Sequence, residues 1–357
     1  MSDRVSGKMR RATVTSFGSA LRLSDDAEIP QPKGSEILVR VQRCGVCHTD
    51  VHVREGFYEL GGGKRLQFAD RGVVPPVTPG HEIYGEIVAT GPQGEGIGRR
   101  GLVYPYVGCG RCAVCQVGDE HMCPDHHYLG LRAPGGYGEY VLLPHARYLL
   151  DTGDLKPSEA ATLACAGVTA YSALRKLDPG SKSGWLGVIG AGGLGLMAIS
   201  LGRALGFDRI VAFEPNEQHR QAALSAGACR AMDSRNPNAL ATAQKEMGGG
   251  AASMIDFVGI PETFNFGTDA LRRGGRYVLV GLHGGEATIS LPLIPLRAIS
   301  IIGTVAGSIP EMTELVALVR TGVLPDLPVS EFGLQDANVA LDKLEAGEVV
   351  GRLVLVP

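Results

Sequence analysis

The sequence predicts an α/β protein in which a compact, strand-rich barrel is joined to a doubly wound parallel sheet. Short alternating strands with frequent turn signals fill the chain up to about residue 166, and a repeated strand–helix–strand rhythm follows. The 357 residues suit two domains, and the 44% of apolar residues can supply a core for each. The 51 glycines are about twice the usual share, which indicates tight turns or close backbone approaches.

Period-2 alternation marks the strand-rich part. In residues 36–42, every second residue is apolar, and these side chains would lie on one face of a strand. Residues 83–89 repeat the pattern. Proline and glycine punctuate the chain around these strands, as at 75–80 and 134–136. We therefore expect short strands wrapped into a barrel.

Beyond residue 166, short apolar strands alternate with helical patterns. We expect strands at 187–190, 209–213, 253–258, 276–280 and 300–303, with a helix after each of the first two. This rhythm favours a buried parallel sheet with helices on both faces. Residues 314–320 look helical and 352–356 strand-like, so the last fifty residues fit either part.

The charge balance excludes some classes of function. Lys and Arg number 34 against 37 Asp and Glu, for a net charge of −3, so no basic field favours binding to nucleic acid. The first 17 residues lack the apolar stretch of a secretory signal, and we predict a cytoplasmic protein. Residues 183–202 carry no charge, but their seven glycines argue against a membrane helix.

Four cysteines within fifteen residues form the strongest chemical signal. They are Cys109, Cys112, Cys115 and Cys123. Four thiolates on a tight loop can surround one Zn²⁺, and with no open position such a site is structural. An iron–sulfur cluster is the sharper alternative, but its motif has three residues before the fourth cysteine where this chain has seven. Unligated buried cysteines are the plain alternative.

A second cluster combines two groups that lie far apart in the sequence. Cys47 begins the run Cys-His-Thr-Asp-Val-His, and His81 precedes Glu82. A thiolate and an imidazole with coordination left open are typical of a catalytic metal site. Two alternatives stay open at this point: a redox pair of Cys44 with Cys47, and a purely structural role for His81 in a turn.

A glycine motif follows the first predicted strand of the parallel sheet. Its residues are Gly190, Gly192, Gly193, Leu194 and Gly195. Glycines here let the backbone turn and approach a pyrophosphate at a helix N-terminus. Glu214, nineteen residues after the motif, suits the ribose hydroxyls of NAD and repels the 2′-phosphate of NADP. The alternative is an exposed charge at a strand end.

These signals, in this order and over nearly the whole chain, resemble the zinc-dependent medium-chain alcohol dehydrogenases. The family-like segments are 47–50, 80–82, the four-cysteine lobe, 165–169, the glycine motif and 351–352. The resemblance implies a GroES-like catalytic domain made of residues 1–166 and 305–357. It also implies a Rossmann cofactor domain of residues 167–304.

The resemblance also implies the ligands of the catalytic zinc. Cys165 becomes the third ligand, beside Cys47 and His81. Glu82 lies next to the zinc as an alternate ligand, and Asp50 orients His81, a role common for such partners.

By the same resemblance, Thr49 takes the proton of the alcohol. The proton passes through the nicotinamide ribose to His52, which reaches solvent, and Thr49 and His52 would share one face of a helical turn. His48 and Arg352 match positions that contact the pyrophosphate, and Thr169 matches one beside the nicotinamide.

The predicted function is reversible hydride transfer between a primary or secondary alcohol and NAD, giving an aldehyde or ketone. A polyol dehydrogenase of the same family is the close alternative, although relatives acting on polyols often carry a carboxylate where this chain has Cys165. A non-catalytic cofactor-binding protein is the alternative from another class. We expect two zinc ions per chain, a small-molecule substrate, a homo-oligomer (dimer or tetramer), and neither nucleic acid nor membrane as partner.

Two features depart from the family pattern. Residues 57–72 form an insertion between Cys47 and His81, with glycines at 61–63. Loops of this size are often functional, and a lid over the substrate cleft, a contact between subunits and a neutral surface insertion are all compatible with it. Cys44 is the other departure and is expected to be a spectator near the site.

Overall fold

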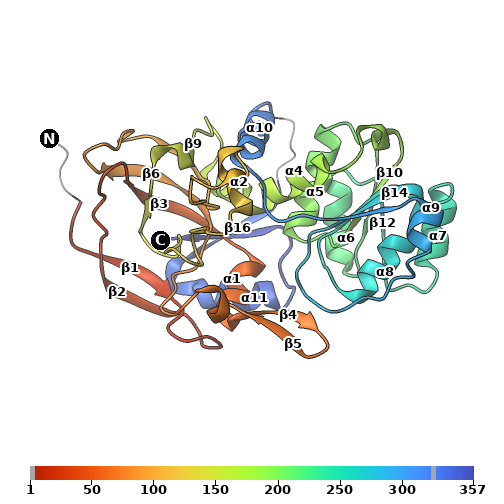
Figure 1. Cartoon of the computed structure of the whole chain (residues 1–357), viewed down its shortest axis with the longest axis horizontal. Coiled ribbons are helices and arrows are strands. Elements are labelled where there is room, and N and C mark those ends of the chain that lie inside the picture. Colours follow the sequence, from red (N-terminus) through yellow and green to blue (C-terminus); the bar gives the residue numbers. More distant parts are fainter. Residues whose placement is uncertain (1–4, 323–326) are drawn as a thin grey trace.

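The computed structural model describes residues 5–322 and 327–357. It consists of two parts that lie side by side (Figure 1). One part is built around a seven-stranded sheet that is mostly antiparallel, and the other around a six-stranded parallel sheet. The predicted α/β class, a strand-rich part joined to a parallel sheet, is confirmed.

In the six-stranded sheet, the order of the strands reverses near the centre. Its strands, in spatial order, are β12 (Arg230–Met232), β11 (Arg209–Phe213), β10 (Trp185–Ile189), β13 (Ala251–Asp256), β14 (Leu271–Leu279) and β15 (Ser300–Gly303). The chain order reverses between β10 and β13. In open α/β sheets such a reversal leaves a crevice at the carboxyl ends of the strands, where ligands bind.

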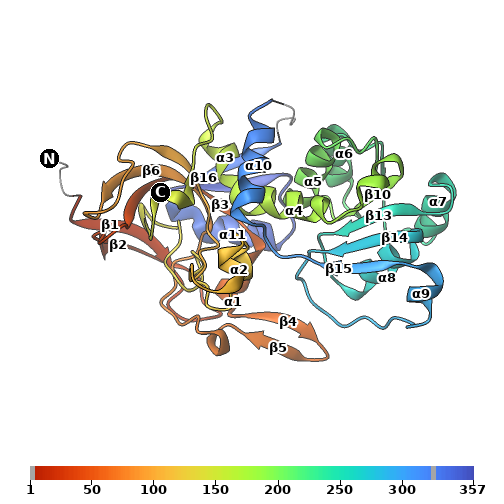
Figure 2. The ribbon, with the colours of Figure 1, turned by 45° about the horizontal axis from the view of Figure 1, so that its top comes forward.

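Helices cover both faces of this sheet (Figure 2). They are α5 (Gly193–Ala204) and α6 (Glu217–Ser225) on one face, and α7 (Ala239–Glu246), α8 (Pro261–Asp269) and the short α9 (Leu293–Arg297) on the other. Side chains alternate between the two faces, as strand geometry requires. Val188 packs into the core that includes α5, whereas Ile189 and Phe213 pack with Phe264 of α8.

The seven-stranded sheet collects strands from both ends of the chain. It contains β3 (Ile37–Val46), β6 (Glu82–Thr90), β7 (Arg100–Val103), β8 (Tyr140–Leu143), β9 (Leu149–Leu150), β16 (Val329–Gly333) and β17 (Arg352–Val356), and a separate hairpin is formed by β1 (Lys8–Thr13) and β2 (Arg22–Glu28). Because β17 pairs with β3, the last residues of the chain belong to the first part. The sequence left open to which part the last fifty residues belong. Residues 329–357 belong to the part with the seven-stranded sheet.

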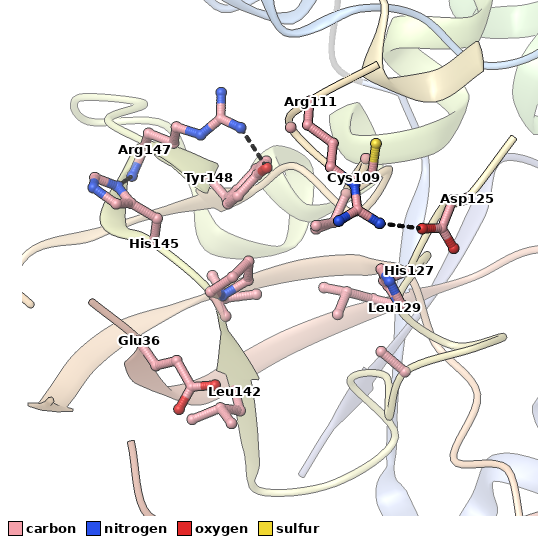
Figure 3. A pocket seen from close by; sticks show the side chains of 16 residues that line it. Glu36, Cys109, Arg111, Asp125, His127, Leu129, Leu142, His145, Arg147 and Tyr148 are labelled. Carbon is pink, nitrogen blue, oxygen red and sulfur yellow. Dashed lines mark hydrogen bonds and ion pairs between the residues drawn. The ribbon is translucent and has the colours of Figure 1, made fainter. Parts of the chain in front are cut away.

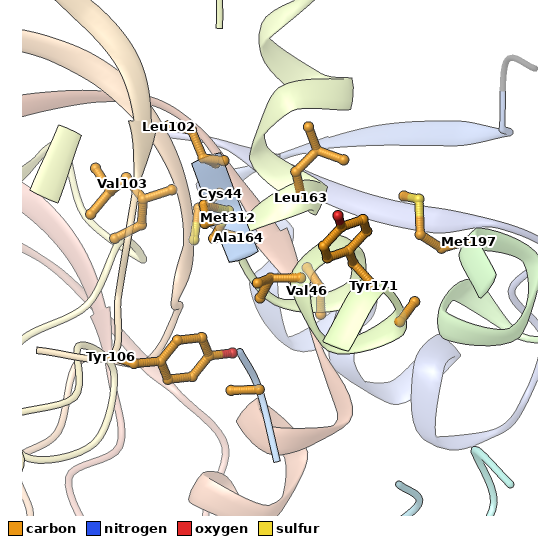
Figure 4. Close-up of a cluster of buried hydrophobic side chains, with 14 of the residues drawn as sticks. Cys44, Val46, Leu102, Val103, Tyr106, Leu163, Ala164, Tyr171, Met197 and Met312 are labelled. Carbon is orange, nitrogen blue, oxygen red and sulfur yellow. The ribbon is translucent and has the colours of Figure 1, made fainter. Parts of the chain in front are cut away.

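A continuous core joins the two parts through a run of helical turns. The run comprises α3 (Pro157–Thr162), a π-helical turn (Leu163–Gly167) and α4 (Val168–Arg175), with α10 (Ile309–Val319) packed beside it. Figure 4 shows Cys44, Leu163, Tyr171, Met197 and Met312 meeting in this core. Cys165 lies inside the π-helical turn, so the packing between the parts also fixes the predicted third zinc ligand.

The inserted region forms a hairpin next to the first helix. Helix α1 (His48–Glu55) ends at Gly56, whose φ of 92° is the left-handed cap that favours glycine. Strands β4 (Phe57–Gly61) and β5 (Lys64–Gln67) follow and are joined by Gly62 and Gly63, both with positive φ, as the tightest hairpin turns require. The hairpin projects from α1 below the junction of the two parts (Figures 1 and 2).

Several boundaries differ from the sequence prediction. Strand β14 begins at Leu271, five residues before the predicted 276, and α10 begins at Ile309, because Ser308 caps it. The uncharged run at 183–202 is divided between β10 and α5. Within 5–322 and 327–357, no helix is both long enough and apolar enough to cross a bilayer.

Candidate active site

The four cysteines of the loop converge on one point. Their sulfur atoms all lie within 4.8 Å of one another, with Cys112 Sγ 3.4 Å from Cys115 Sγ and 3.7 Å from Cys123 Sγ. Backbone N–H groups of Arg111 and Cys112 lower the pKa of Cys109 to about 6, which favours its thiolate. Four soft donors and no water position fit a structural Zn²⁺.

This lobe borders the cavity shown in Figure 3, of about 560 Å³. Cys109, Arg111 and Asp125 lie on one side of it, and His145 and Arg147 on another. Arg111 pairs with Asp125 at 3.6 Å. None of the residues predicted to bind the cofactor or the catalytic zinc lines this cavity, so it is separate from the active site.

The second donor set assembles from three elements. Cys47 follows the end of β3, His81 directly precedes β6, and Cys165 lies in the π-helical turn. Their ligand atoms fall within 4.8 Å of one another, with Cys47 Sγ 3.9 Å from Cys165 Sγ. All three side chains are buried. Two sulfurs and one imidazole leave a fourth tetrahedral position open, which fits a catalytic Zn²⁺.

Asp50 connects the segments that carry these ligands. Its fully buried carboxylate accepts hydrogen bonds from the N–H of Cys47 and the N–H of Gly80, both at 3.0 Å, and from the Tyr137 hydroxyl at 3.2 Å. Oδ1 also lies 3.3 Å from Nδ1 of His81. The imidazole therefore presents its Nε2 to the thiols, as a zinc ligand oriented by a carboxylate does.

The pKa values of Cys47 and Cys165 favour metal binding. The Cys165 thiol hydrogen-bonds to Cys47 and lowers the pKa of Cys47 well below its usual range, with further help from His81. The pKa of Cys165 is raised in turn by the same hydrogen bond and by burial. One of the two thiols, that of Cys47, is therefore already a thiolate without a metal. A bound cation would have to displace only the proton of Cys165.

Glu82 and Arg352 form a buried ion pair beside the donor set. The Arg352 guanidinium donates to Glu82 Oε2, and Glu82 Oε1 accepts the N–H of Ala166 at 3.1 Å. Burial raises the pKa of Glu82, and the positive charge of Arg352 opposes this. Arg352 also passes close to Gly193, and its buried Nε has no partner among the described atoms. It thus connects the zinc side with the glycine motif.

The glycine motif forms a cradle between β10 and α5. Gly190 has φ of 83°, and a Cβ at Gly195 would collide with the Gly190 carbonyl oxygen. A Cβ at Gly192 would instead meet no described atom within 4 Å. Leu194 lies in the first turn of α5. The open space lies at a helix N-terminus, where a pyrophosphate is favoured.

Glu214 lies at the edge of this cradle. It is only 7% exposed, so its interpretation as an exposed strand-end charge is wrong. Oε2 accepts the N–H of Ala191 at 2.9 Å, and Oε1 accepts the N–H of Asn216 at 2.8 Å. Burial raises its pKa, but the hydrogen bonds from His219, Asn216 and Ala191 outweigh burial and lower the pKa overall. The group is therefore anionic.

The remaining predicted residues lie on α1 and α4. Thr49 and His52 lie one turn apart on α1, and His52 Nδ1 is 3.4 Å from Glu55 Oε2. The His48 ring centroid is 5.1 Å from that of His283, which follows β14 in the other part, and burial lowers the pKa of His48 to about 4. Thr169 is buried in the first turn of α4.

Sequence reasoning missed three aromatic residues of this region. The Tyr106 hydroxyl interacts with Cys165, the ring of His283 contacts that of His48, and Tyr58 of the hairpin contacts both Thr49 and His52. The insertion that holds Tyr58 stood out by its length, but no local pattern marked the other two.

Comparisons with known proteins agree with this arrangement. The family model for the alcohol dehydrogenase GroES-like domain matches residues 33–153, and that for zinc-binding dehydrogenase matches residues 193–321. An NAD-dependent alcohol dehydrogenase of Sulfurisphaera tokodaii is 38% identical over 355 residues, which covers 98% of this chain and 100% of that protein.

Solved structures are similar over the same extent. The alcohol dehydrogenase of Aeropyrum pernix matches with a TM-score of 0.86 and 30% identity, covering 98% of this chain and 100% of that one. The acetophenone reductase of Geotrichum candidum in complex with NAD matches with a TM-score of 0.85 and 27% identity, covering 99% of each chain.

The chain belongs to the zinc-dependent medium-chain alcohol dehydrogenases. It is accordingly an enzyme of the zinc- and NAD-dependent class that interconverts alcohols and carbonyl compounds.

Proposed function

We propose that the chain oxidises primary or secondary alcohols, and reduces the matching aldehydes or ketones, at the site formed by Cys47, His81 and Cys165. One observation carries this proposal: Arg352 connects a buried three-donor set, which leaves a fourth position for substrate, with a glycine cradle at a helix N-terminus. When bound, Zn²⁺ supplies a Lewis acid that lowers the pKa of a hydroxyl, and NAD accepts hydride.

The chain's own residues provide the route for the proton. The Thr49 hydroxyl lies one turn from His52 on α1, and we assign it the first acceptance of the alcohol proton. Because the His52 side chain is still 14% exposed, it can exchange protons with solvent. Burial lowers the pKa of His52, so the imidazole is a neutral acceptor at pH 7.

Arg352, His48 and Thr169 are assigned to the cofactor. The unpartnered Arg352 Nε and the nearness of its side chain to Gly193 support a pyrophosphate contact. We assign Glu214 to the ribose hydroxyls of NAD, since its buried anionic carboxylate would repel a 2′-phosphate. Glu82 is assigned as the alternate ligand of the zinc.

The polyol alternative and the non-catalytic alternative are weaker. Cys165 completes the donor set where a polyol enzyme often has a carboxylate, and an abandoned site would not need three converging ligands. A panel of aliphatic, aromatic and alicyclic alcohols and polyols, assayed with NAD and with NADP, tests the substrate class and Glu214 together. Equal activity with NADP would contradict the role of Glu214.

Thr49→Val tests the proton route. We expect this variant to lose most turnover, because valine has a similar shape and no hydroxyl, while NAD affinity changes little. A rate equal to that of the unchanged enzyme would exclude Thr49 from proton transfer.

We also propose a cytoplasmic homo-oligomer, a dimer or tetramer. Strand β15 is the edge of its sheet, and Leu291, Leu296, Ile301 and Val305 are exposed close to it in the chain. An exposed apolar sheet edge is prone to pair with another chain. Domain boundaries of 1–166 with 305–357, and 167–304, are supported by which strands each sheet contains, although residues 1–4 and 323–326 lie outside the described part.

A further inference from the structure

The insertion places one aromatic side chain directly on the proposed proton route. Tyr58 lies in β4, three residues after the end of α1. Its ring centroid is 4.8 Å from that of His52 and 4.9 Å from that of Phe68, which packs on Tyr58 edge-on. The Thr49 hydroxyl interacts with the Tyr58 hydroxyl and lowers the pKa of Tyr58, against the larger effect of burial. The Tyr58 side chain therefore contacts both Thr49 and His52, the two residues that we propose to transfer the alcohol proton.

The hairpin is held in place at its base. Phe68 is almost completely buried, and its N–H donates to the Gly56 carbonyl oxygen at 2.8 Å, which closes the hairpin against the end of α1. A Cβ at Gly56 would collide with Phe17, so the cap also packs against the turn between β1 and β2. The Tyr58 ring is thereby fixed between α1 and Phe68.

The tip of the hairpin is held by the cofactor-binding part. A Cβ at Gly61 would collide with the backbone at Glu286, and a Cβ at Gly284 would collide with the carbonyl oxygen of Glu59. Glycines at these positions allow direct backbone packing between the two parts. Lys64 Nζ adds an ion pair with Glu286 at 3.6 Å. The hairpin that carries Tyr58 is therefore held both by α1 and by the cofactor-binding part.

We propose that Tyr58 is a positioning residue that fixes the Thr49 hydroxyl and the His52 imidazole in the geometry of proton transfer. This inference rests on the proposed function of Thr49. The interaction between the two hydroxyl groups restricts the rotation of the Thr49 hydroxyl and leaves a lone pair of Thr49 Oγ1 to accept the alcohol proton. The ring restricts the rotation of the imidazole.

The phenol can fulfil this role without itself exchanging a proton. Burial raises the pKa of Tyr58 to about 12, so its hydroxyl stays protonated at neutral pH. The ring also shields His52, whose other charged or titratable neighbours are Glu55, His283 and Cys47. Removing the hydroxyl and removing the ring should consequently have separable effects.

The test is a double-mutant cycle of Tyr58→Phe and Thr49→Val in the zinc-loaded enzyme. Tyr58→Phe alone should lower kcat for alcohol oxidation by about 3- to 10-fold, the usual worth of one hydrogen bond. The KM for alcohol and the Kd for NADH, measured by fluorescence, should change less than about twofold. In the Thr49→Val background, Tyr58→Phe should cause no further loss.

A spectroscopic readout tests the ring independently of activity. In histidine-labelled protein, Tyr58→Leu should shift the His52 ring resonances and raise the pKa of His52, because burial is what lowers it. Tyr58→Phe should leave that pKa unchanged. Tyr140→Phe, which removes the hydroxyl of a half-buried tyrosine in β8, is the matched control and should leave both rate and resonances unaltered.

The outcomes separate the two proposals. An unimpaired Thr49→Val enzyme overturns the proton route and with it the role of Tyr58. An impaired Thr49→Val enzyme with an unimpaired Tyr58→Phe enzyme overturns the role of Tyr58 alone. Equal losses from Tyr58→Phe in both backgrounds would show a general structural effect and would also overturn positioning.

Discussion

The Asp50 carboxylate lies 3.3 Å from Nδ1 of His81, on the side of the imidazole away from the two thiols. The same carboxylate accepts the N–H of Cys47 and of Gly80, the residue before His81. One buried anion thus contacts the imidazole of His81 and both of the segments that carry the proposed ligands Cys47 and His81. This explains how elements 34 residues apart can form a metal site without a shared loop.

Asp50→Asn should weaken the catalytic zinc site. The neutral amide no longer favours the His81 tautomer that presents Nε2, and its NH₂ group cannot accept the backbone N–H bonds that one of the carboxylate oxygens accepts. We expect about 10- to 100-fold lower affinity for one zinc ion per chain, measured as zinc retained during titration with a chelator. The structural zinc should be unaffected.

Asp256→Asn provides the matched control for that experiment. Asp256 is also fully buried and accepts hydrogen bonds from Val258, Gly259 and the Tyr277 hydroxyl, but it lies in the parallel sheet. It should lower stability without changing zinc retention. If Asp50→Asn keeps both zinc ions at wild-type chelator concentrations, the assigned role of Asp50 is refuted.

Gly192→Ala should separate cofactor binding from folding. A Cβ at Gly192 meets no described atom within 4 Å, and the residue does not have positive φ. Thermal stability should therefore change by no more than about 2 °C, a fraction of 1 kcal/mol. The methyl group would occupy the space of the pyrophosphate, and the Kd for NADH should rise at least about tenfold.

Gly180→Ala is the control for that substitution. Its Cβ would lie 3.4 Å from Asp178 Oδ1, an ordinary contact far from the cradle. It should leave NADH affinity and stability nearly unchanged. Wild-type NADH affinity in Gly192→Ala would show that the pyrophosphate does not occupy the cradle.

Sequence patterns predicted those parts of the site whose residues lie close together in the chain. The spacing of the four cysteines and of the glycine motif reflects short loops that close on one ligand. The proposed third zinc ligand required a resemblance, because Cys165 lies 84 residues after His81 and is placed by a π-helical turn. Tyr58 could not be assigned before the hairpin was seen to return along α1.

The fold was predictable to a similar degree. Short apolar strands such as β10 and β11 stood out because both faces of the sheet are covered. Strand β12 has only three residues, none fully buried, so it left no periodic signal. In β14, Gly274 with φ of 72° interrupts the pattern, which explains why the early half of the strand was not predicted.

Cys112→Ser should remove the structural zinc and leave the catalytic one. Metal analysis should fall from two zinc ions per chain to one. Because a structural zinc contributes folding free energy directly, we expect a melting temperature lower by about 10 °C, corresponding to a loss of several kcal/mol. Cys229→Ser, an exposed thiol outside both clusters, should change neither value. Iron in the unchanged protein would contradict the assignment.

His126 should make the protein less stable in mild acid. Its ring stacks on Tyr128 at 3.8 Å, and burial, with Arg132 and Arg71 nearby, lowers its pKa to about 4. The unfolded chain therefore binds the proton more readily than the folded one between pH 6.5 and 4, and stability falls as the pH drops through this window.

His126→Gln removes that proton uptake. Chemical denaturation between pH 7 and pH 5 should show a decline in unfolding free energy that is smaller by about 1 kcal/mol, after allowance for partial solvent screening. Between pH 7 and 8.5 the imidazole is neutral in both states, so the two proteins should show parallel profiles there. Identical declines below pH 7 would mean that His126 titrates normally in the folded protein and that its contacts with Tyr128 and Arg132 do not oppose its charge.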